Sequence, residues 1–420
     1  MVRRRLPAAA AALAAGLAGQ ICLARTCAAQ DLFSPDTVHG LVELRAATAG
    51  GERSWTDGGF GKTPVSGHHA KAEVSQAVLE WRPRFSFAAS AVVSGQYQAD
   101  GVHPRFDLDE AYLKLRSPPS RAGRISARAG LFYPPISLEH DGVGWTSTDL
   151  LSASAVNSWI GEEVKVVGLE GTATHPLAGG RLSGTFGLFG FNDTSGTLLA
   201  FRGWALHDQK TGAFSRQTLP LLNGDMTGAQ PPWTTPTLEV DERIGFYGRL
   251  AYQFVAPVTL EAFYYDNRGD PMAFTDDLQW GWRTRFLNVG ARVDFSPRTR
   301  LLAQAMTGST QMGQDMPEEE FWVDTRFRAA FVRLTHEVGP VALSARLDLF
   351  DTRQRGEYVY ADDDEEGWSL TGAVDWRLTD QARVIVEGLH VESERGARLR
   401  LGVAPRQAQD VVQASMRITL

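Results

Sequence analysis

The feature that most limits the fold of this chain is an alternation of apolar and polar residues with a period of two. In the segment 258–266, Leu260, Ala262 and Tyr264 share one side, and Glu261 lies on the other. Because successive side chains of a strand point to opposite faces, this pattern predicts strands with one apolar face. The pattern predicts about sixteen strands, most of them near the 9–11 residues that a tilted membrane-spanning strand needs. They are expected at 38–47, 71–81, 85–97, 107–116, 124–132, 163–174, 181–191, 244–254, 258–266, 286–295, 299–308, 326–338, 341–351, 367–377, 382–392 and 411–420.

The connections between these segments alternate strictly between short and long. Short connections such as 82–84, 256–257 and 339–340 take turns with long ones such as 48–70 and 267–285. All long loops therefore leave one rim and all tight turns the other, which is typical of outer-membrane barrels. After the first 29 residues, the chain has no stretch of about 18 consecutive apolar residues that could form a helical membrane span. We predict an all-β, transmembrane, antiparallel up-and-down barrel over residues 30–420.

The first residues predict a cleaved signal peptide over 1–29. Three arginines at positions 3–5 precede an Ala/Leu run from Leu6 to Ala18 that is too short to cross a bilayer. Cys27-Ala28-Ala29 fits a small-x-small cleavage site. Cys22 leaves a lipoprotein open as an alternative, although Gly19-Gln20-Ile21 matches a lipobox poorly. Export through the inner membrane to the cell outer membrane is the localisation that follows.

Charge and cysteine usage exclude several classes of protein. The chain has 42 Lys and Arg against 49 Asp and Glu, whereas a nucleic-acid binder would need a basic footprint. Both cysteines, Cys22 and Cys27, fall inside the expected signal peptide. The remainder therefore has no disulfide, no thiolate metal site and no cysteine nucleophile. We expect no cofactor, no bound metal and no nucleic-acid partner.

One connection differs from the others in composition. The strand 124–132 is followed by Pro134-Pro135, which cannot donate N–H groups, and then by a polar, Gly-rich run to Gly161. A long loop inside a compact β protein is usually functional or disordered. We predict that 133–162 folds into the barrel and narrows it. The longer segment 192–243 is predicted to be an extracellular loop that caps the mouth or touches a neighbour.

Two short motifs carry a family resemblance. The segment 130–139, Gly-Leu-Phe-Tyr-Pro-Pro-Ile-Ser-Leu-Glu, and the earlier Asp109-Glu110-Ala111-Tyr112-Leu113 resemble the phosphate-selective porin O/P family. The resemblance implies a sixteen-stranded, trimeric diffusion channel whose third outer loop folds inward. That family lines its constriction with arginines and lysines, whereas this chain has none between Tyr133 and Glu162.

Charged residues recur on the side of the strands that faces the lumen. An arginine on the lipid side at mid-bilayer would cost about 2–4 kcal/mol, so the alternation predicts that these residues face water. The predicted pore wall comprises Arg249, Arg292, Arg300, Arg346 and Arg377. The predicted constriction sets the loop acids Glu139, Asp141 and Asp149 against the wall residues Arg45, Lys114, Arg116 and Arg128. Such an arrangement would select ions by a transverse field. The simpler alternative is that these residues only solvate the lumen and pair with one another.

The sequence therefore favours a porin for passive diffusion of small hydrophilic solutes or ions, with anions such as phosphate among the candidates. Its expected partners are those solutes, outer-membrane lipids, the barrel-assembly machinery and two further copies in a homotrimer. A barrel enzyme such as a lipase is an alternative that needs a Ser and a His in contact, and His336 and His390 lie in predicted strands. A structural or adhesive barrel with a plugged lumen is the other alternative. We expect that the chain is not an enzyme.

Overall fold

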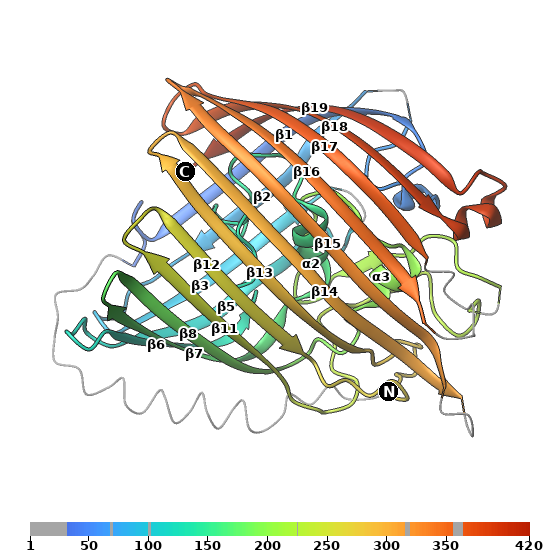
Figure 1. Cartoon of the computed structure of the whole chain (residues 1–420), viewed down its shortest axis with the longest axis horizontal. Coiled ribbons are helices and arrows are strands. Elements are labelled where there is room, and N and C mark those ends of the chain that lie inside the picture. Colours follow the sequence, from blue (N-terminus) through green and yellow to red (C-terminus); the bar gives the residue numbers. More distant parts are fainter. Residues whose placement is uncertain (1–31, 68–69, 100–101, 225, 316–319, 356–363) are drawn as a thin grey trace.

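The computed structural model describes residues 32–67, 70–99, 102–224, 226–315, 320–355 and 364–420. Sixteen antiparallel strands close into one barrel, in which β1 pairs with β19, for example Val42 with Ile418 (Figure 1). The predicted fold is therefore confirmed. The signal peptide expected over 1–29 lies outside the described residues.

The barrel strands follow one another around the wall almost in chain order. Their bounds are β1 Val38–Gly51, β2 Lys71–Trp81, β3 Ala89–Gln98, β5 Phe106–Arg116, β6 Arg124–Phe132, β7 Val166–Leu177, β8 Gly180–Gly190, β11 Gly245–Phe254, β12 Val258–Asp266, β13 Arg283–Ser296, β14 Thr299–Asp315, β15 Glu320–Val338, β16 Val341–Gln354, β17 Glu365–Arg377, β18 Ala382–Arg395 and β19 Arg406–Thr419. Three short strands, β4 Val102–His103, β9 Arg216–Thr218 and β10 Trp233–Thr234, form a separate small sheet.

Several strands, such as β14, β15 and β19, are longer than predicted, and two predicted strands begin too early. The strand expected from residue 163 begins at Val166, because Glu163 is the last residue of a helix, α2 (Ala155–Glu163). The strand expected from residue 85 begins at Ala89, because Phe85 and Ser86 both donate backbone hydrogen bonds to the carbonyl of Ala89 in a turn. Both errors extend a strand into a neighbouring turn or helix.

The outer face of the barrel is apolar, as the alternation predicted. On β19, Val412 is 57% exposed whereas its neighbour Gln413 is 6% exposed. The same alternation exposes Leu250, Leu347 and Val374 on other strands. Because exposed apolar side chains cover the strands so widely, the outer surface is suited to contact with lipid. Among the described helices, none has the length and apolar character needed to cross a bilayer.

Three long connections fold into the interior. We call them loop 1 (52–70), loop 3 (133–165) and loop 4 (191–244). Loop 1 begins with the short helix η1 (Trp55–Asp57), loop 3 carries α2, and loop 4 carries α3 (Thr197–Phe201). Figure 1 shows α2 behind the front strands of the barrel. All residues of α2 and α3 are buried, so the third outer loop lies inside the barrel as predicted.

The interior contains a hydrophobic core, which the prediction of a wet bore missed. Trp159 of α2 packs between Phe286 and Phe327, with ring centroids 5.3 and 5.2 Å away. Phe263 and Tyr265 of β12 belong to the same cluster and are at most 1% exposed. In this part of the barrel the inward side chains therefore pack against one another and do not face water. Strands such as β12 carry apolar side chains on both faces, so α2 is held by packing as well as by polar contacts.

Candidate functional site

Loop 3 is directed into the barrel where β6 ends. Pro134 and Pro135 lack N–H groups, so they cannot continue the hydrogen-bonded ladder. Gln304 of β14 then holds the loop at two points. Its side-chain amide donates to the carbonyl of Ile136 at 2.9 Å, and its carbonyl oxygen accepts from the backbone N–H of Leu138 at 3.1 Å. The loop is therefore fastened to the wall within a few residues of leaving it.

Glu139 anchors the start of α2. Ser154 caps the helix, and the carboxylate of Glu139 accepts from the Ser154 N–H at 2.9 Å and from the Asn157 amide at 2.7 Å. Its other oxygen lies 3.5 Å from Arg333 and 3.6 Å from Arg346. Burial opposes ionisation of Glu139, but the charges of Arg346 and Arg333 outweigh it and lower the pKa. Glu139 is 1% exposed, so it holds the loop and does not line open water.

Asp149 and Asp141 are the predicted loop acids that reach solvent. Asp149 lies between Arg300 and Arg333, accepts from Arg333 at 2.8 Å and keeps 12% of its side chain exposed. Asp141 is exposed and accepts from the hydroxyl of Thr148 at 2.8 Å. Thus two carboxylates of loop 3 face the accessible part of the lumen.

The four wall residues predicted opposite this loop do not meet its carboxylates, although Arg128 donates to the loop's Tyr133 carbonyl at 3.0 Å. Arg128 forms two hydrogen bonds with Glu170, at 2.8 and 2.9 Å, and Arg45 pairs with Glu43 and Asp208. Arg116 donates to the Phe87 carbonyl at 2.8 Å near a tight turn, and Lys114 is exposed on the same strand. The structure therefore does not place Arg45, Lys114, Arg116 or Arg128 against the loop's carboxylates. Arg300 and Arg346, predicted as wall residues, contact the loop instead.

Further arginines of the wall donate hydrogen bonds to the backbone of loop 3, and the prediction did not name them as site residues. Arg383 donates to the carbonyl of Thr148 at 3.1 Å, and Arg417 donates to the carbonyl of Ser147 at 2.5 Å. Arg333 is the residue shared by Glu139 and Asp149. The alternation of β15 provides the signal that could have found it, because its neighbours Val332 and Leu334 are exposed on the outer face.

Loop 4 is joined to loop 3 by a buried ion pair. Arg202, directly after α3, donates two hydrogen bonds to Glu162 of α2, at 2.7 and 2.5 Å. His207 lies 3.1 Å from the same carboxylate. Burial opposes ionisation of Glu162, but the charges of Arg202 and His207 outweigh it and lower the pKa to about 2. The two loops therefore form one unit inside the barrel.

The neighbouring Glu163 makes a second junction between the same loops. Its carboxylate accepts from the Trp159 indole at 2.6 Å and from the backbone N–H groups of Gly196 and Leu198 at 3.0 and 2.9 Å. Burial raises the pKa of Glu163 to about 7. Two adjacent glutamates thus stabilise the contact between loops 3 and 4. Glu162 pairs with cations, whereas Glu163 accepts hydrogen bonds from backbone and indole N–H groups.

Loop 1 completes the set of inward loops. Lys62 forms an ion pair with Glu365 of β17 and donates to the Arg202 carbonyl at 3.3 Å. Beside it, a cavity of about 50 Å³ is bordered by Arg45, Val65 and Asp208. One water needs about 10–15 Å³ on this measure, so the cavity has room for only a few waters. The outer half of the lumen is therefore narrow where loops 1 and 4 meet.

The opposite half of the lumen, near the tight turns, is open and basic. In the part of the chain that the structure describes, five exposed cations occupy inward-facing positions of their strands and have no carboxylate within 4.0 Å. This set, which we call the basic vestibule, comprises Lys114, Arg116, Arg124, Arg181 and Arg377. The predicted wall residues Arg249 and Arg292 lie in the same half but pair with Glu261 and Asp294.

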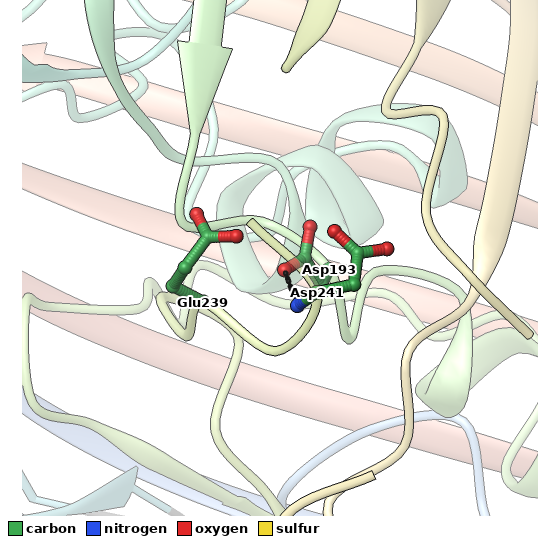
Figure 2. A group of neighbouring side chains, drawn as sticks. All are labelled: Asp193, Glu239 and Asp241. Atoms are coloured by element: carbon green, nitrogen blue, oxygen red, sulfur yellow. Dashed lines mark hydrogen bonds between the residues drawn. The ribbon is translucent and has the colours of Figure 1, made fainter. Parts of the chain in front are cut away.

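A group of three carboxylates lies in loop 4 near the opposite rim. Asp193, Glu239 and Asp241 bring one oxygen each within 4.8 Å of the others. Figure 2 shows the three side chains in loop 4. Burial, reinforced by repulsion from Glu239, raises the pKa of Asp193 to about 8. Carboxylate oxygens are ligands that Ca²⁺ and Mg²⁺ accept. The backbone N–H of Val240 donates to Asp193 at 2.6 Å, so the group also has a structural role.

The two histidines considered for an enzyme have other partners. His336 contacts the hydroxyl of Thr299 at 2.9 Å, and His390 contacts Asp410 at 2.7 Å on the outer face of β18 and β19. Among the described residues, neither histidine has a serine as its hydrogen-bond partner. The absence of enzyme activity stays a prediction.

Comparison with known proteins supports the architecture. No protein-family model and no curated protein matches the chain. An outer membrane protein of Vibrio cholerae, OmpT with loop L8 deleted, matches with a TM-score of 0.50 and 10% identity over 91% of this chain and 99% of that chain. An anion-selective porin from Comamonas acidovorans matches with a TM-score of 0.51 and 12% identity, over 91% and 99%. At these identities the similarity shows a shared fold.

Proposed function

We propose that this protein is an outer-membrane porin through which small hydrophilic solutes, and anions in preference to cations, diffuse passively. The observation that carries the proposal is the closed sixteen-stranded barrel whose outer face exposes apolar side chains. In a bilayer, a barrel satisfies every backbone polar group because it has no open edge. The similarity to an anion-selective porin supports the same architecture.

The anion preference rests on the basic vestibule. Lys114, Arg116, Arg124, Arg181 and Arg377 are exposed cations around the tight-turn end of the lumen, whereas most other inward charges there are paired. Charged rings at the mouth of a pore raise the local concentration of the opposite ion. Asp141 and Asp149 moderate this field from loop 3. We therefore propose a general anion preference, with phosphate as one permeant anion among several.

A barrel closed by its own loops is the second candidate. Inward side chains of β16–β18 such as Asp348, Thr371 and Glu387 are completely buried under the inward loops. In a wide aqueous channel these positions would be wet. This burial supports a narrow channel, and it also fits a structural barrel without conductance.

Planar bilayers separate the two candidates. We expect purified protein to form pores of low single-channel conductance, because loops 1, 3 and 4 occupy the outer half of the lumen. In a KCl gradient, the reversal potential should have the sign of chloride preference. Membranes that stay insulating with folded, inserted protein would favour the closed barrel. Cation preference would remove the anion proposal and leave the porin. A homotrimer, insertion by the barrel-assembly machinery and export by a signal peptide stay predictions.

A further inference from the structure

We propose that Arg300 and Arg333 form a binding site for a doubly charged tetrahedral oxyanion, and that Asp149 of loop 3 occupies this site as a tethered competitor when no solute is bound. The inference deepens the proposed anion preference by naming a site and a class of solute, and it rests on the proposed porin. Three features of the lumen support it: the contacts of Asp149, the unpartnered donors beside them, and an open cavity at Arg300.

Arg300 and Arg333 belong to neighbouring strands, β14 and β15, and both face the lumen. Arg300 pairs with Thr335, which is two positions from Arg333, so the two guanidinium groups start from adjacent steps of the inward face. Both donate from Nη2 to the same oxygen, Oδ2 of Asp149, and the distance from Arg333 is 2.8 Å. A single carboxylate oxygen therefore bridges the two cations.

The contact with Asp149 leaves one donor of each guanidinium without a partner. Nε and Nη2 lie on the same edge of a guanidinium and form a fork that takes two oxygens of one anion. Among the described residues, the Nε atoms of Arg300 and Arg333 are both buried and have no hydrogen-bond partner. Arg333 as a whole is only 2% exposed. A buried donor without a partner costs free energy, so an occupant that pairs with both Nε atoms is favoured.

The two forks select the shape and charge of the occupant. A carboxylate has two oxygens and fills one fork, whereas a tetrahedral oxyanion presents four oxygens and reaches both. Two negative charges also match the two arginines. Because Asp149 is attached to loop 3, its effective concentration at the site is on the order of millimolar or higher. A free anion therefore displaces it only by binding better than a carboxylate does, and sulfate and hydrogen phosphate share the required shape and charge.

Asp149 can leave the site without the rest of loop 3, because its contacts reach solvent. The side chains of Asp149 and Arg300 are 12% and 24% exposed. Ion pairs that water reaches are weak and are screened by salt. The backbone that follows has its own support, since Leu151 and Ser152 donate their N–H groups to Glu387 at 2.7 and 3.2 Å. The carboxylate of Asp149 can therefore turn into the lumen while the loop stays in place.

An open cavity gives solutes access to the site from the tight-turn end. It has a volume of about 510 Å³, and its lining includes Arg298 and Arg300. Pockets of roughly 300–1,000 Å³ are typical of small-ligand sites. Of the other charges that line the cavity, Asp294 pairs with Arg292 at 3.0 Å, which leaves Arg298 and Arg300 against Glu337. An oxyanion in this cavity therefore meets more positive than negative charge on its way to Arg300.

Equilibrium dialysis of the refolded full chain in detergent tests the site without requiring a pore. The probe is radiolabelled sulfate, with hydrogen phosphate or acetate as competitor in separate arms at pH 8. We expect sulfate and hydrogen phosphate to bind within threefold of each other and at least tenfold more tightly than acetate. Asp149→Asn removes the tethered competitor and should raise the affinity for sulfate at least threefold. Arg300→Gln should lower it at least tenfold, and it decides the case if Asp149→Asn does not refold.

Two exposed residues at the same end of the barrel provide matched controls. Asp380→Asn, in the turn between β17 and β18, removes one negative charge, and Arg121→Gln, in the turn between β5 and β6, removes one positive charge. Both should leave sulfate binding within twofold of the parent. A gain in Asp380→Asn equal to that in Asp149→Asn would attribute the effect to overall charge and overturn the site. A loss in Arg121→Gln equal to that in Arg300→Gln would do the same.

The other outcomes also overturn the proposal. Acetate binding as tight as that of sulfate would refute the tetrahedral shape. A difference of more than threefold between sulfate and hydrogen phosphate would show that the site distinguishes more than the dianion they share. An unchanged affinity in a folded Asp149→Asn variant would show that Asp149 is no competitor. Bilayer conductance of the same samples separates this inference from the porin: pores without sulfate binding refute the site alone, and sulfate binding without pores refutes the channel alone.

Discussion

Glu162 and Arg202 are joined by two hydrogen bonds of 2.7 and 2.5 Å inside the barrel, where their side chains are at most 1% exposed. The pair connects α2 of loop 3 to the residue after α3 of loop 4. A fully desolvated pair is costly to break from one side, because the remaining charge stays buried without compensation. We therefore expect the inward loops to move as one body and the width of the lumen to depend on this contact.

Replacing Glu162 by Gln should loosen that body. Loss of one partner of a buried ion pair destabilises a protein by about 3–5 kcal/mol. We expect a lower free energy of unfolding in urea and a larger, noisier single-channel conductance. Asp270→Asn is the control, because Asp270 forms an exposed pair with Arg243, with 30% and 50% of the two side chains exposed. Such a pair contributes about 1 kcal/mol or less. Equal effects of the two changes would contradict the role of Glu162.

The opposite pKa shifts of Glu162 and Glu163 predict a maximum of stability between their two titrations. The folded pKa of Glu163 is about 7 against a reference of 4.5, so its contribution is complete below pH 4.5 and is lost as the pH rises through 7. The folded pKa of Glu162 is about 2, so its contribution is present above pH 4.5 and is lost as the pH falls toward 2.

Unfolding midpoints in urea, measured from pH 3 to pH 9, check this prediction. Glu163→Gln should flatten the decline between pH 4.5 and 7, and Glu162→Gln should flatten the decline on the acid side. The shift of Glu163 corresponds to about 3 kcal/mol as an upper estimate. A Glu163→Gln variant with the same alkaline decline as the parent would show that another group causes it.

The barrel could be predicted from the sequence because its signal is local and repeated. Each strand shows the alternation within its own residues, and turn residues such as Gly339-Pro340 mark where a strand ends. The prediction failed where a local pattern continued past the element, as at Glu163, whose backbone belongs to α2. Apolar character on both faces of β12, from Ala262 to Tyr265, was present in the sequence and indicates the internal core.

The site was predicted only in part, because its contacts are long-range. The loop acids Glu139 and Asp149 and the wall arginines Arg300 and Arg346 were named from composition and alternation. Which acid meets which arginine depends on how loop 3 crosses the lumen, and nothing local to the sequence encodes that path. Arg333, between Glu139 and Asp149, follows from alternation, but its partners do not.

Reversing charge in the basic vestibule should weaken the preference for anions. Lys114→Glu and Arg377→Glu each replace an exposed inward cation by an anion, and we expect the chloride-to-potassium permeability ratio to fall at least twofold in each. Arg268→Glu is the control, because Arg268 is exposed in the connection between β12 and β13, at the rim of the long loops. Reversal potentials in a KCl gradient measure the ratio. Equal shifts in the control would attribute the effect to overall charge.

Gly144 should be required for the position of loop 3 against the wall. It has a φ of 60°, and a Cβ there would lie 2.2 Å from a methyl group of Val78 on β2. The side chain of Lys210 also donates to its carbonyl, so the backbone cannot retreat freely. Gly144→Ala should therefore push the loop away from β2, lower the temperature at which the barrel unfolds on gels, and change the conductance.

Gly58→Ala separates this steric effect from backbone strain. Gly58 has a φ of 78°, and no atom lies within 4 Å of the position that a Cβ would take, so the change adds only the left-handed conformation of an alanine, about 1–2 kcal/mol. We expect Gly144→Ala to be clearly the more damaging of the two and the only one to alter conductance. Equal losses, with conductance unchanged in both, would mean that loop 3 does not need its close approach to Val78.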